Sequence, residues 1–279
     1  MKKNWKKILY RTVMVVLASV FAYCCYYLIN YQIGSQKNQE SYDHLAQLVE
    51  DRPLLPPPSV NESTEPVETE PDEILVTVRN PETGETRKVL PEFAHLYTLN
   101  PDLVGWISID GTKVNYPVVQ SGTDNANYYL KHNFEKKYSV HGCIYAAETT
   151  DVFTPSDNVI LYGHRMGDNS MFGQLGLYTD KAFWETHQYI LFDTLEERHL
   201  YQVIAVFATS VSYGRGFAYH RFVDAADPEE FESFVQQCKA LSYYDTGLTA
   251  EYGDKLLTLS TCEYTNTNGR LVVIAKQIA

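Results

Sequence analysis

A thiol and a guanidinium stand at the facing ends of two predicted strands. Cys262 closes the apolar, β-branched run 256–261, and Arg270 opens the next such run, 271–273. If the two strands are neighbours, both side chains reach one site. There a cysteine thiolate acts as a nucleophile, and an arginine stabilises the negative charge that develops during its attack. The simpler interpretations are a buried structural cysteine and a surface ion pair between Arg270 and Glu263.

A histidine lies at the end of a third strand. The run 158–162 has the pattern of a buried strand, stops at Gly163 and is followed directly by His164. Histidine has a reference pKa near ~6.5 and therefore exchanges protons at neutral pH. A single histidine at a strand end is more often structural. Together with a thiol, however, it supplies the general acid and base that cleavage of an amide needs.

The five residues 258–262 read Thr-Leu-Ser-Thr-Cys. This segment, with His164 on an earlier strand and Arg270 on the following one, resembles the catalytic signature of the sortases. The chain is similar to class B sortases from about residue 91 to its C-terminus. The other segments that carry this similarity are 100–107, 116–120, 124–125, 129–130 and 170–172.

The resemblance implies a cysteine transpeptidase that needs no metal or cofactor. In such an enzyme the thiolate of Cys262 attacks a threonine carbonyl in a sorting motif, expels the downstream peptide and forms a thioester, which an amine then releases. His164 would act as general acid and then as base, and Arg270 would bind the developing oxyanion. Ser260 and Glu263, which flank the nucleophile, are the substrate-binding residues that the resemblance implies.

The resemblance also implies two kinds of partner. One is a surface protein with a sorting motif of the Asn-Pro-x-Thr or Ser-Pro-x-Thr type, and the other is an amine from a peptidoglycan precursor or a pilin subunit. Wall anchoring and pilin polymerisation both stay open, because one acyl-enzyme accepts different amines. A cysteine hydrolase would use water instead, although papain-like signatures are absent around the cysteine. A wall-associated binding protein would keep the fold with an inert thiol.

The N-terminus predicts a membrane anchor. Residues 1–7 contain four lysines, and residues 8–31 are predominantly apolar. As a helix, residues 8–31 would measure roughly 36 Å at ~1.5 Å per residue, enough to cross a ~30 Å hydrocarbon core. The positive-inside rule places residues 1–7 in the cytoplasm and the rest outside, in an envelope of the Gram-positive type. A cleaved signal peptide is the alternative, but bulky tyrosines at 23, 26 and 27 stand where small residues are required.

Residues 32–90 are expected to form an extracellular stalk or linker. Between residues 51 and 73, prolines and glutamates are interleaved, so this stretch cannot bury enough apolar surface to fold. The formal net charge is −12, and four lysines precede the membrane segment while no acidic residue does, which makes the exterior part more acidic still. This charge argues against nucleic-acid binding, which usually needs a basic face.

Three of the five cysteines, Cys143, Cys238 and Cys262, follow the predicted anchor. An odd number in an exported domain implies at least one free thiol. A Cys143–Cys238 disulfide is an alternative, and three reduced thiols are the default expectation. The tripeptide His-Gly-Cys at 141–143 lacks a second well-spaced ligand pair, so we do not expect a metal site there.

Residues 91–279 are predicted to form one mainly β catalytic domain. An Asp-Gly turn at 110–111 between two strand-like runs predicts a hairpin over 106–119. The resemblance to sortases implies an eight-stranded β-barrel with an N-terminal helix and a helix-bearing insertion before the catalytic strand. Further strands are expected at 142–146, 159–162, 189–194, 200–211, 255–261 and 271–276.

Two helices are predicted in this domain, at 94–99 and 227–241. The second begins with Asp227 as its N-cap and a proline at its first position. Its apolar residues recur at helical spacing and predict a buried stripe, so Cys238 is expected to be structural. The stripe consists of Phe231, Phe234, Val235, Cys238 and Leu241.

Overall fold

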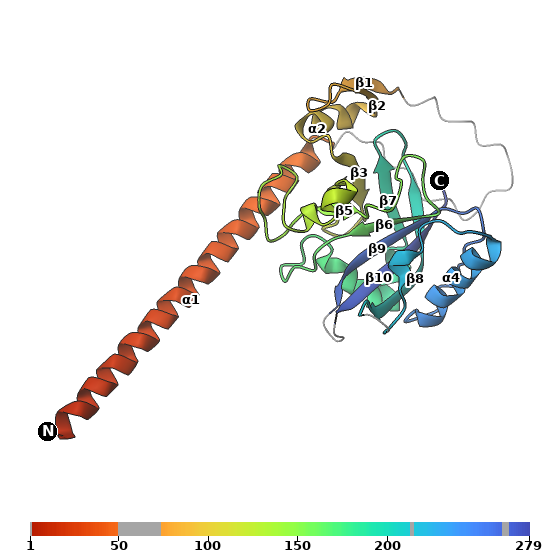
Figure 1. Ribbon diagram of the computed structural model, residues 1–279. Coiled ribbons are helices and arrows are strands. Elements are labelled where there is room, and N and C mark those ends of the chain that lie inside the picture. Colours follow the sequence, from red (N-terminus) through yellow and green to blue (C-terminus); the bar gives the residue numbers. More distant parts are fainter. Residues whose placement is uncertain (1, 50–73, 213–214, 264–267) are drawn as a thin grey trace. The chain divides into compact units, whose positions relative to one another are not determined.

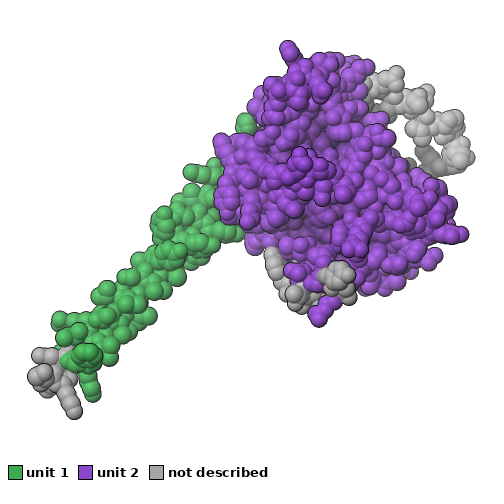
Figure 2. Space-filling view, viewed as in Figure 1, with its two compact units in different colours: residues 1–44 green, residues 45–279 purple. Residues whose placement is uncertain are grey.

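The computed structural model describes residues 2–49, 74–212, 215–263 and 268–279. The chain divides into two compact units, 1–44 and 45–279 (Figure 2). The first unit is formed by α1, a helix that spans Lys2–Gln47 and whose last three residues belong to the second unit. Its segment Trp5–Gln47 contains a stretch long and apolar enough to cross a membrane, and the side chains of that stretch are not buried. This helix is compatible with a single membrane anchor.

Eight strands of the second unit close into a barrel in the order β10-β8-β7-β3-β4-β5-β6-β9 (Figure 1). The predicted mainly β fold and the eight-stranded barrel are therefore confirmed. A closed barrel pairs both edges of every strand, so its backbone groups are satisfied without exposed edges. The strands are β3 (Leu103–Ser108), β4 (Asn115–Val119), β5 (Ile144–Ala146), β6 (Asn158–Tyr162), β7 (Tyr189–Thr194), β8 (Leu200–Ser210), β9 (Leu256–Glu263) and β10 (Gly269–Gln277).

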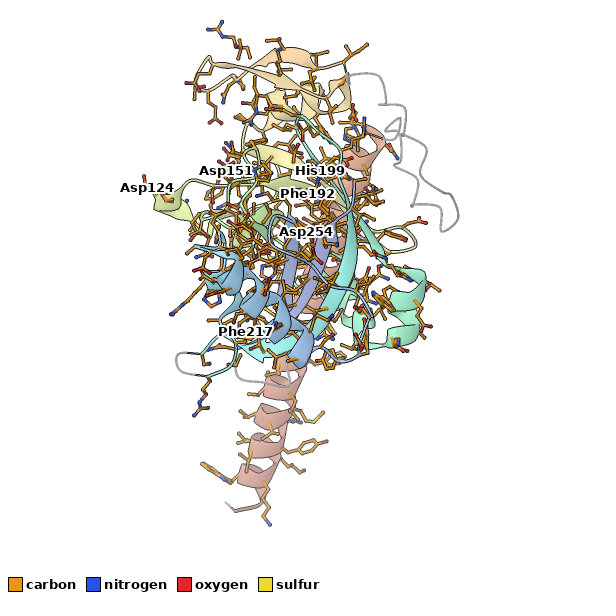
Figure 3. The ribbon with its side chains drawn as sticks, turned by 90° about the vertical axis from the view of Figure 1, so that its right-hand side faces the viewer. Asp124, Asp151, Phe192, His199, Phe217 and Asp254 are labelled. Carbon is orange, nitrogen blue, oxygen red and sulfur yellow. The ribbon has the colours of Figure 1, made fainter. Side chains whose placement is uncertain are left out.

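The strands form where the sequence is apolar and β-branched, and their inward side chains fill the barrel. Phe192 lies among the buried side chains, whereas Asp124 lies exposed at the periphery (Figure 3). The predicted hairpin joins β3 to β4, and Gly111 adopts the left-handed φ of +71° that its turn requires. Strand β5 begins two residues later than expected, because Gly142 has a φ of +60° and cannot extend it.

Folded structure is present on both sides of the proline-rich stretch in the expected linker 32–90. Helix α1 continues to Gln47, and β1 (Val76–Arg79) pairs with β2 (Thr86–Val89) as an antiparallel hairpin. The backbone N–H of Leu90 donates to the carbonyl of Leu195 at 2.6 Å, which ties the end of this hairpin to the turn after β7. The Pro/Glu-rich part, 51–73, lies outside the described residues.

Short helices connect the strands of the second unit. The predicted helix before the first barrel strand is α2 (Ala94–Leu99), which follows the short helix η1 (Pro91–Phe93). The side chain of Asp180 caps α3 by accepting from the Ala182 N–H. The others are η2 (Thr123–Asn125), η3 (Tyr128–Leu130), η4 (Gly173–Thr179), α3 (Lys181–Thr186) and η5 (Tyr219–Arg221).

The predicted insertion between β8 and β9 carries α4, which spans Pro228–Leu241. The Asp227 side chain caps this helix by accepting from the Glu230 N–H at 2.9 Å. Four residues of the predicted stripe are buried, against side chains of β8 and β10. Leu241 is the exception at 45% exposure, because the last turn of α4 lies at the rim of a cavity rather than over the barrel.

Cys143 and Cys238 are both buried, but they belong to different parts of the core. The Cys143 thiol faces the carbonyl of Pro117 at 3.8 Å, whereas Cys238 packs under α4. No disulfide joins these two described residues. Burial raises the pKa of the Cys238 thiol strongly, which suits the structural role that the helical pattern predicts.

Candidate active site

The pairing of β9 with β10 brings Cys262 and Arg270 together. Each is the direct partner of the other across the antiparallel ladder. Directly opposed residues of antiparallel strands point to the same face of a sheet with their Cβ atoms about 5 Å apart. Both side chains are partly exposed, so the thiol and the guanidinium are accessible from one side of the barrel.

His164 reaches the same place from the other side of β9. Strand β6 runs parallel to β9 with Tyr162 opposite Ser260, and the Gly163 N–H continues this pairing by donating to the Ser260 carbonyl at 3.2 Å. His164 therefore comes level with Cys262. A Cβ atom at Gly163 would lie 2.5 Å from the Ile144 side chain, so glycine allows the close packing at this strand end.

The three residues predicted from the sequence line one cavity of about 380 Å³. The structure thus unites Cys262, His164 and Arg270 in the space where a substrate can bind. No group of three or more histidine, cysteine or carboxylate side chains suited to a metal ion occurs among the described residues. The chemistry available to these groups is nucleophilic attack, proton exchange and stabilisation of an oxyanion.

The orientation of the His164 ring is set by a backbone carbonyl. Its Nε2 atom lies 2.7 Å from the oxygen of Leu130. A carbonyl can only accept, so Nε2 carries a proton and donates, which leaves Nδ1 to exchange a proton. Nearby His141 is buried, and this burial lowers its pKa, with Asp168 opposing the decrease and His164 adding to it. At neutral pH, His141 therefore adds no positive charge beside His164.

Arg270 keeps most of its hydrogen-bonding capacity for a ligand. Its Nη1 donates to the carbonyl of Gly269 at 2.9 Å, and it forms no ion pair with any carboxylate among the described side chains. Glu263 ends β9, but its side chain lies outside the described residues. The ion pair between Arg270 and Glu263 and the substrate-binding role of Glu263 therefore stay untested.

Ser260 lines the cavity, although its hydroxyl group is already engaged. The side chain is 1% exposed, and its oxygen lies 2.6 Å from the phenol oxygen of Tyr219. The segment before Tyr219 is fixed to β8, because the Phe217 N–H donates to the Thr209 hydroxyl at 2.8 Å. Ser260 thus positions the Tyr219 wall of the cavity.

Several lining residues were not found from the sequence. They come from loops and strands that are distant in the chain; Leu130 and Tyr162 lie in segments singled out in the sequence, but nothing local marks any of these residues as part of the site. Burial raises the pKa of Tyr145 to about 12; the charge of Glu148 adds to the increase, whereas Arg270 opposes it. These additional residues are Asn127, Leu130, Tyr145, Glu148, Tyr162, Val211, Tyr219 and His220.

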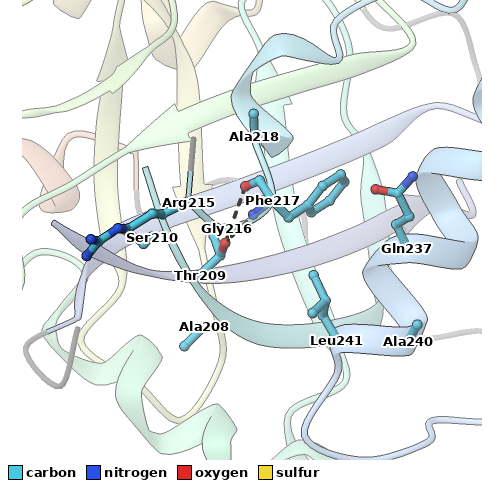
Figure 4. Close-up of a pocket in the computed structure, with 10 residues that line it drawn as sticks. All are labelled: Ala208, Thr209, Ser210, Arg215, Gly216, Phe217, Ala218, Gln237, Ala240 and Leu241. Atoms are coloured by element: carbon cyan, nitrogen blue, oxygen red, sulfur yellow. Dashed lines mark hydrogen bonds between the residues drawn. The ribbon is translucent and has the colours of Figure 1, made fainter. Parts of the chain in front are cut away.

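A second and larger cavity, of about 940 Å³, lies between the end of β8 and α4 (Figure 4). Phe217, Gln237 and Leu241 are among its lining residues, and a hydrogen bond joins two of the lining residues, Thr209 and Phe217. None of the three predicted catalytic residues lines it. Cavity size therefore does not identify the reactive site; the placement of the thiol, imidazole and guanidinium does.

Comparison with known proteins agrees with this geometry. The family model for the sortase domain matches residues 107–278. Sortase B of Staphylococcus aureus is 35% identical over 192 residues, which cover 68% of this chain and 76% of that protein. Sortase B of Listeria monocytogenes is 32% identical over 199 residues, covering 70% and 78%.

Solved structures give the same result for the fold. The crystal structure of sortase B from Bacillus anthracis in complex with AAEK1 aligns with a TM-score of 0.67 and 30% identity, over 88% of this chain and 98% of that one. A Staphylococcus aureus sortase B–substrate complex aligns with a TM-score of 0.69 and 28% identity over the same shares. The chain therefore belongs to the sortase family, the cysteine transpeptidases, and within that family to class B.

Proposed function

We propose that this sortase cleaves a sorting motif of secreted proteins after its threonine and transfers the acyl group to an amine of the cell wall. The observation that carries the proposal is the register of β9 and β10, which sets Cys262 opposite Arg270 in a cavity that His164 also lines. The acyl donors are surface proteins with the motif, and the amine comes from a peptidoglycan precursor.

In the first half-reaction the Cys262 thiolate attacks the threonine carbonyl carbon. The carbonyl oxygen becomes an oxyanion, which the Arg270 guanidinium stabilises through its unused N–H groups. Collapse of this intermediate breaks the amide bond and leaves a thioester on Cys262. The departing nitrogen needs a proton, and Nδ1 of a doubly protonated His164 supplies it, since Nε2 is held by Leu130.

The second half-reaction reverses these roles. The acceptor amine attacks the thioester carbon, and His164, now neutral at Nδ1, takes a proton from the amine nitrogen. The Cys262 thiolate leaves as the new amide forms, and Arg270 again stabilises the oxyanion. Arginine suits this role because it stays cationic throughout and presents several donors in one plane.

The proposed placement is at the outer face of a cell membrane. The apolar part of α1, residues 8–31, would cross the bilayer once, with the lysines of residues 1–7 on the cytoplasmic side. The catalytic domain would then face the wall of a Gram-positive type envelope. In this arrangement the residues near 51–73 would hold the catalytic domain away from the membrane surface.

The test uses the full-length chain in detergent with peptides of the Asn-Pro-x-Thr and Ser-Pro-x-Thr types. We expect mass spectrometry to find the acyl group on Cys262 and the transfer product to depend on the added amine, and we expect His164→Ala to lose both. Transfer to water alone in the presence of wall-derived amines would instead indicate a cysteine hydrolase. A strong preference for a lysine-bearing pilin peptide as the amine would indicate a pilin polymerase.

A further inference from the structure

The cavity that holds Cys262 contains a carboxylate that the transpeptidase mechanism does not use. Glu148 lines this cavity and is partly exposed. Its side chain forms no hydrogen bond or ion pair within the described part of the chain. Because the protein does not neutralise this charge, the charge is available to a cationic group of a ligand.

The backbone around Glu148 is fixed. The Ala147 N–H donates to the Ile160 carbonyl at 2.8 Å and extends the pairing of β5 with β6 by one residue. The Ala147 carbonyl in turn accepts from Gln120 Nε2 at 2.7 Å and from the Thr150 N–H at 3.1 Å. Glu148 therefore extends from a preorganised backbone, which lowers the entropic cost of binding a partner.

The strand register gives the distance between Glu148 and the nucleophile. Ile160 pairs with Thr258 of β9, and Cys262 lies four residues further along that strand. Ala147, directly before Glu148, lies opposite Ile160, so it is separated from Cys262 by four residues along the strands, roughly 13 Å at ~3.3 Å per residue, and by two strand spacings across them, about 10 Å. Tyr145 lines the same cavity, and its pKa, which burial raises, responds to the charges of both Glu148 and Arg270.

An extended substrate would place one particular residue beside Glu148. The acyl part of the substrate stays attached to Cys262 through both half-reactions, whereas the leaving peptide departs and the amine arrives later. We therefore place the acyl part of the substrate in the cavity beside Cys262. In an extended peptide, the residue four positions before the acylated threonine lies about 13 Å from the thioester, which matches the separation along the strands; the side chain of Glu148 and a long cationic side chain of the substrate together span the distance of about 10 Å across them. For a motif of four residues, this is the residue directly before the motif.

We propose that Glu148 is a specificity-determining residue that binds a lysine or arginine side chain directly preceding the sorting motif. A carboxylate forms charge-assisted hydrogen bonds with either cation. The inference rests on the proposed function and adds to it a preference for one chemical class of donor protein.

The experiment compares three peptides that differ only at the position before the motif, which carries lysine, methionine or glutamate. For the wild-type full-length chain, we expect kcat/KM for the lysine peptide to exceed that for the glutamate peptide roughly tenfold. Glu148→Gln should reduce this ratio to within about twofold, and Glu148→Lys should invert it. The matched control is Glu185→Gln, which removes an exposed carboxylate of α3 and should keep the wild-type ratio.

Ionic strength provides a second readout. The preference of the wild-type chain should fall as salt is raised, whereas Glu148→Gln should respond little. An unchanged ratio in Glu148→Gln would overturn the inference, and so would an equal loss with all three peptides, since Glu148 would then act through Arg270 or the tyrosines. A change confined to the KM of the amine would also overturn it, because Glu148 would then face the acceptor.

Mass spectrometry of the acyl-enzyme separates this inference from the proposed function. If no sorting peptide acylates Cys262 in the wild-type chain, both are wrong. If the three peptides acylate Cys262 at equal rates, only the assignment of Glu148 is wrong.

Discussion

The two ends of the parallel strands β6 and β9 differ in how their polar groups are used. At the N-terminal end, the Asn158 amide donates to the Phe222 carbonyl at 2.8 Å and accepts from the Thr258 hydroxyl at 2.6 Å. At the C-terminal end, Cys262 and His164 face a cavity. One end is thus fully hydrogen-bonded and holds the register, and that register determines which side chains meet at the open end.

The largest expected effect comes from removing the thiol at the open end. Cys262→Ala should lose acyl-enzyme formation and reduce turnover by on the order of 10³-fold or more, since Cys262 is the proposed nucleophile. Stability should change little, because Cys262 is partly exposed. Peptide cleavage, acyl-enzyme mass spectrometry and urea unfolding measure these three quantities.

Cys238→Ala is the matched control for this substitution. Cys238 is fully buried under α4, so its removal should lower the free energy of unfolding by about 1–2 kcal/mol and leave turnover close to wild type. Iodoacetamide should label Cys262 and spare Cys238 in the native protein. Turnover that persists in Cys262→Ala but fails in Cys238→Ala would contradict the assignment of the nucleophile.

The second effect concerns the charge beside the thiol. Arg270→Lys should lower kcat by about 10²-fold or more, because an ammonium cannot reproduce the planar set of donors at the oxyanion. The peptide assay gives kcat and KM separately. The same substitution in the β1–β2 hairpin, Arg79→Lys, tests the effect of the exchange itself and should leave kcat unchanged. Near-wild-type kcat in Arg270→Lys would assign Arg270 to an electrostatic role that any cation fills.

Sequence patterns located the residues at the C-terminal end of β6 and β9 better than they located the residues around that end. Cys262, His164 and Arg270 each lie where a strand-like run starts or stops, so local patterns locate them. The order of β5, β6 and β9 in the barrel is not visible in any local pattern, and this order is what brings Glu148 and Tyr145 into the same cavity. The closed barrel itself was implied by family resemblance and not by periodicity.

Two smaller departures from prediction have the same physical origin. The periodicity of α4 predicts that Leu241 is buried, but exposure of the last helical turn depends on what packs above it. The hairpin β1–β2 lies in a segment expected to be a linker, and the ion pair between Arg87 and Glu196 at 3.1 Å joins β2 to the turn after β7. Both depend on contacts between residues that are distant in the chain.

The third prediction concerns the loss of a hydrogen-bonding side chain at the N-terminal end of β6 and β9. Asn158→Ala leaves the buried Thr258 hydroxyl and the Phe222 carbonyl without their partner, so the free energy of unfolding should fall by about 2–4 kcal/mol. Urea unfolding of the variants measures this loss. Adding Thr258→Val should cost less than the sum of the two single changes, because the unpaired hydroxyl is removed. Additive losses would show that the two side chains act independently.

The smallest expected effect lies one residue earlier, at Asp157, and depends on pH. Burial alone would raise the pKa of this carboxyl, but hydrogen bonds from the Ala225 N–H and the Lys255 ammonium outweigh it, so the pKa is lowered. A lowered folded pKa contributes stability that is present above the unfolded value near ~3.9 and is lost as pH falls through the folded pKa.

Asp157→Asn should therefore reduce the free energy of unfolding at pH 7 by under about 1 kcal/mol, since the ion pair with Lys255 is partly solvated. The difference from wild type should shrink as the pH is lowered from about 5 to about 3. Urea unfolding at a series of pH values measures it, and Glu251→Gln at an exposed site controls for the change in net charge. Turnover at pH 7 should match wild type, because this end of β6 and β9 holds the register and takes no part in the chemistry. A loss of turnover without a loss of stability would show that the two ends of β6 and β9 are coupled by contacts other than the pairing of these strands.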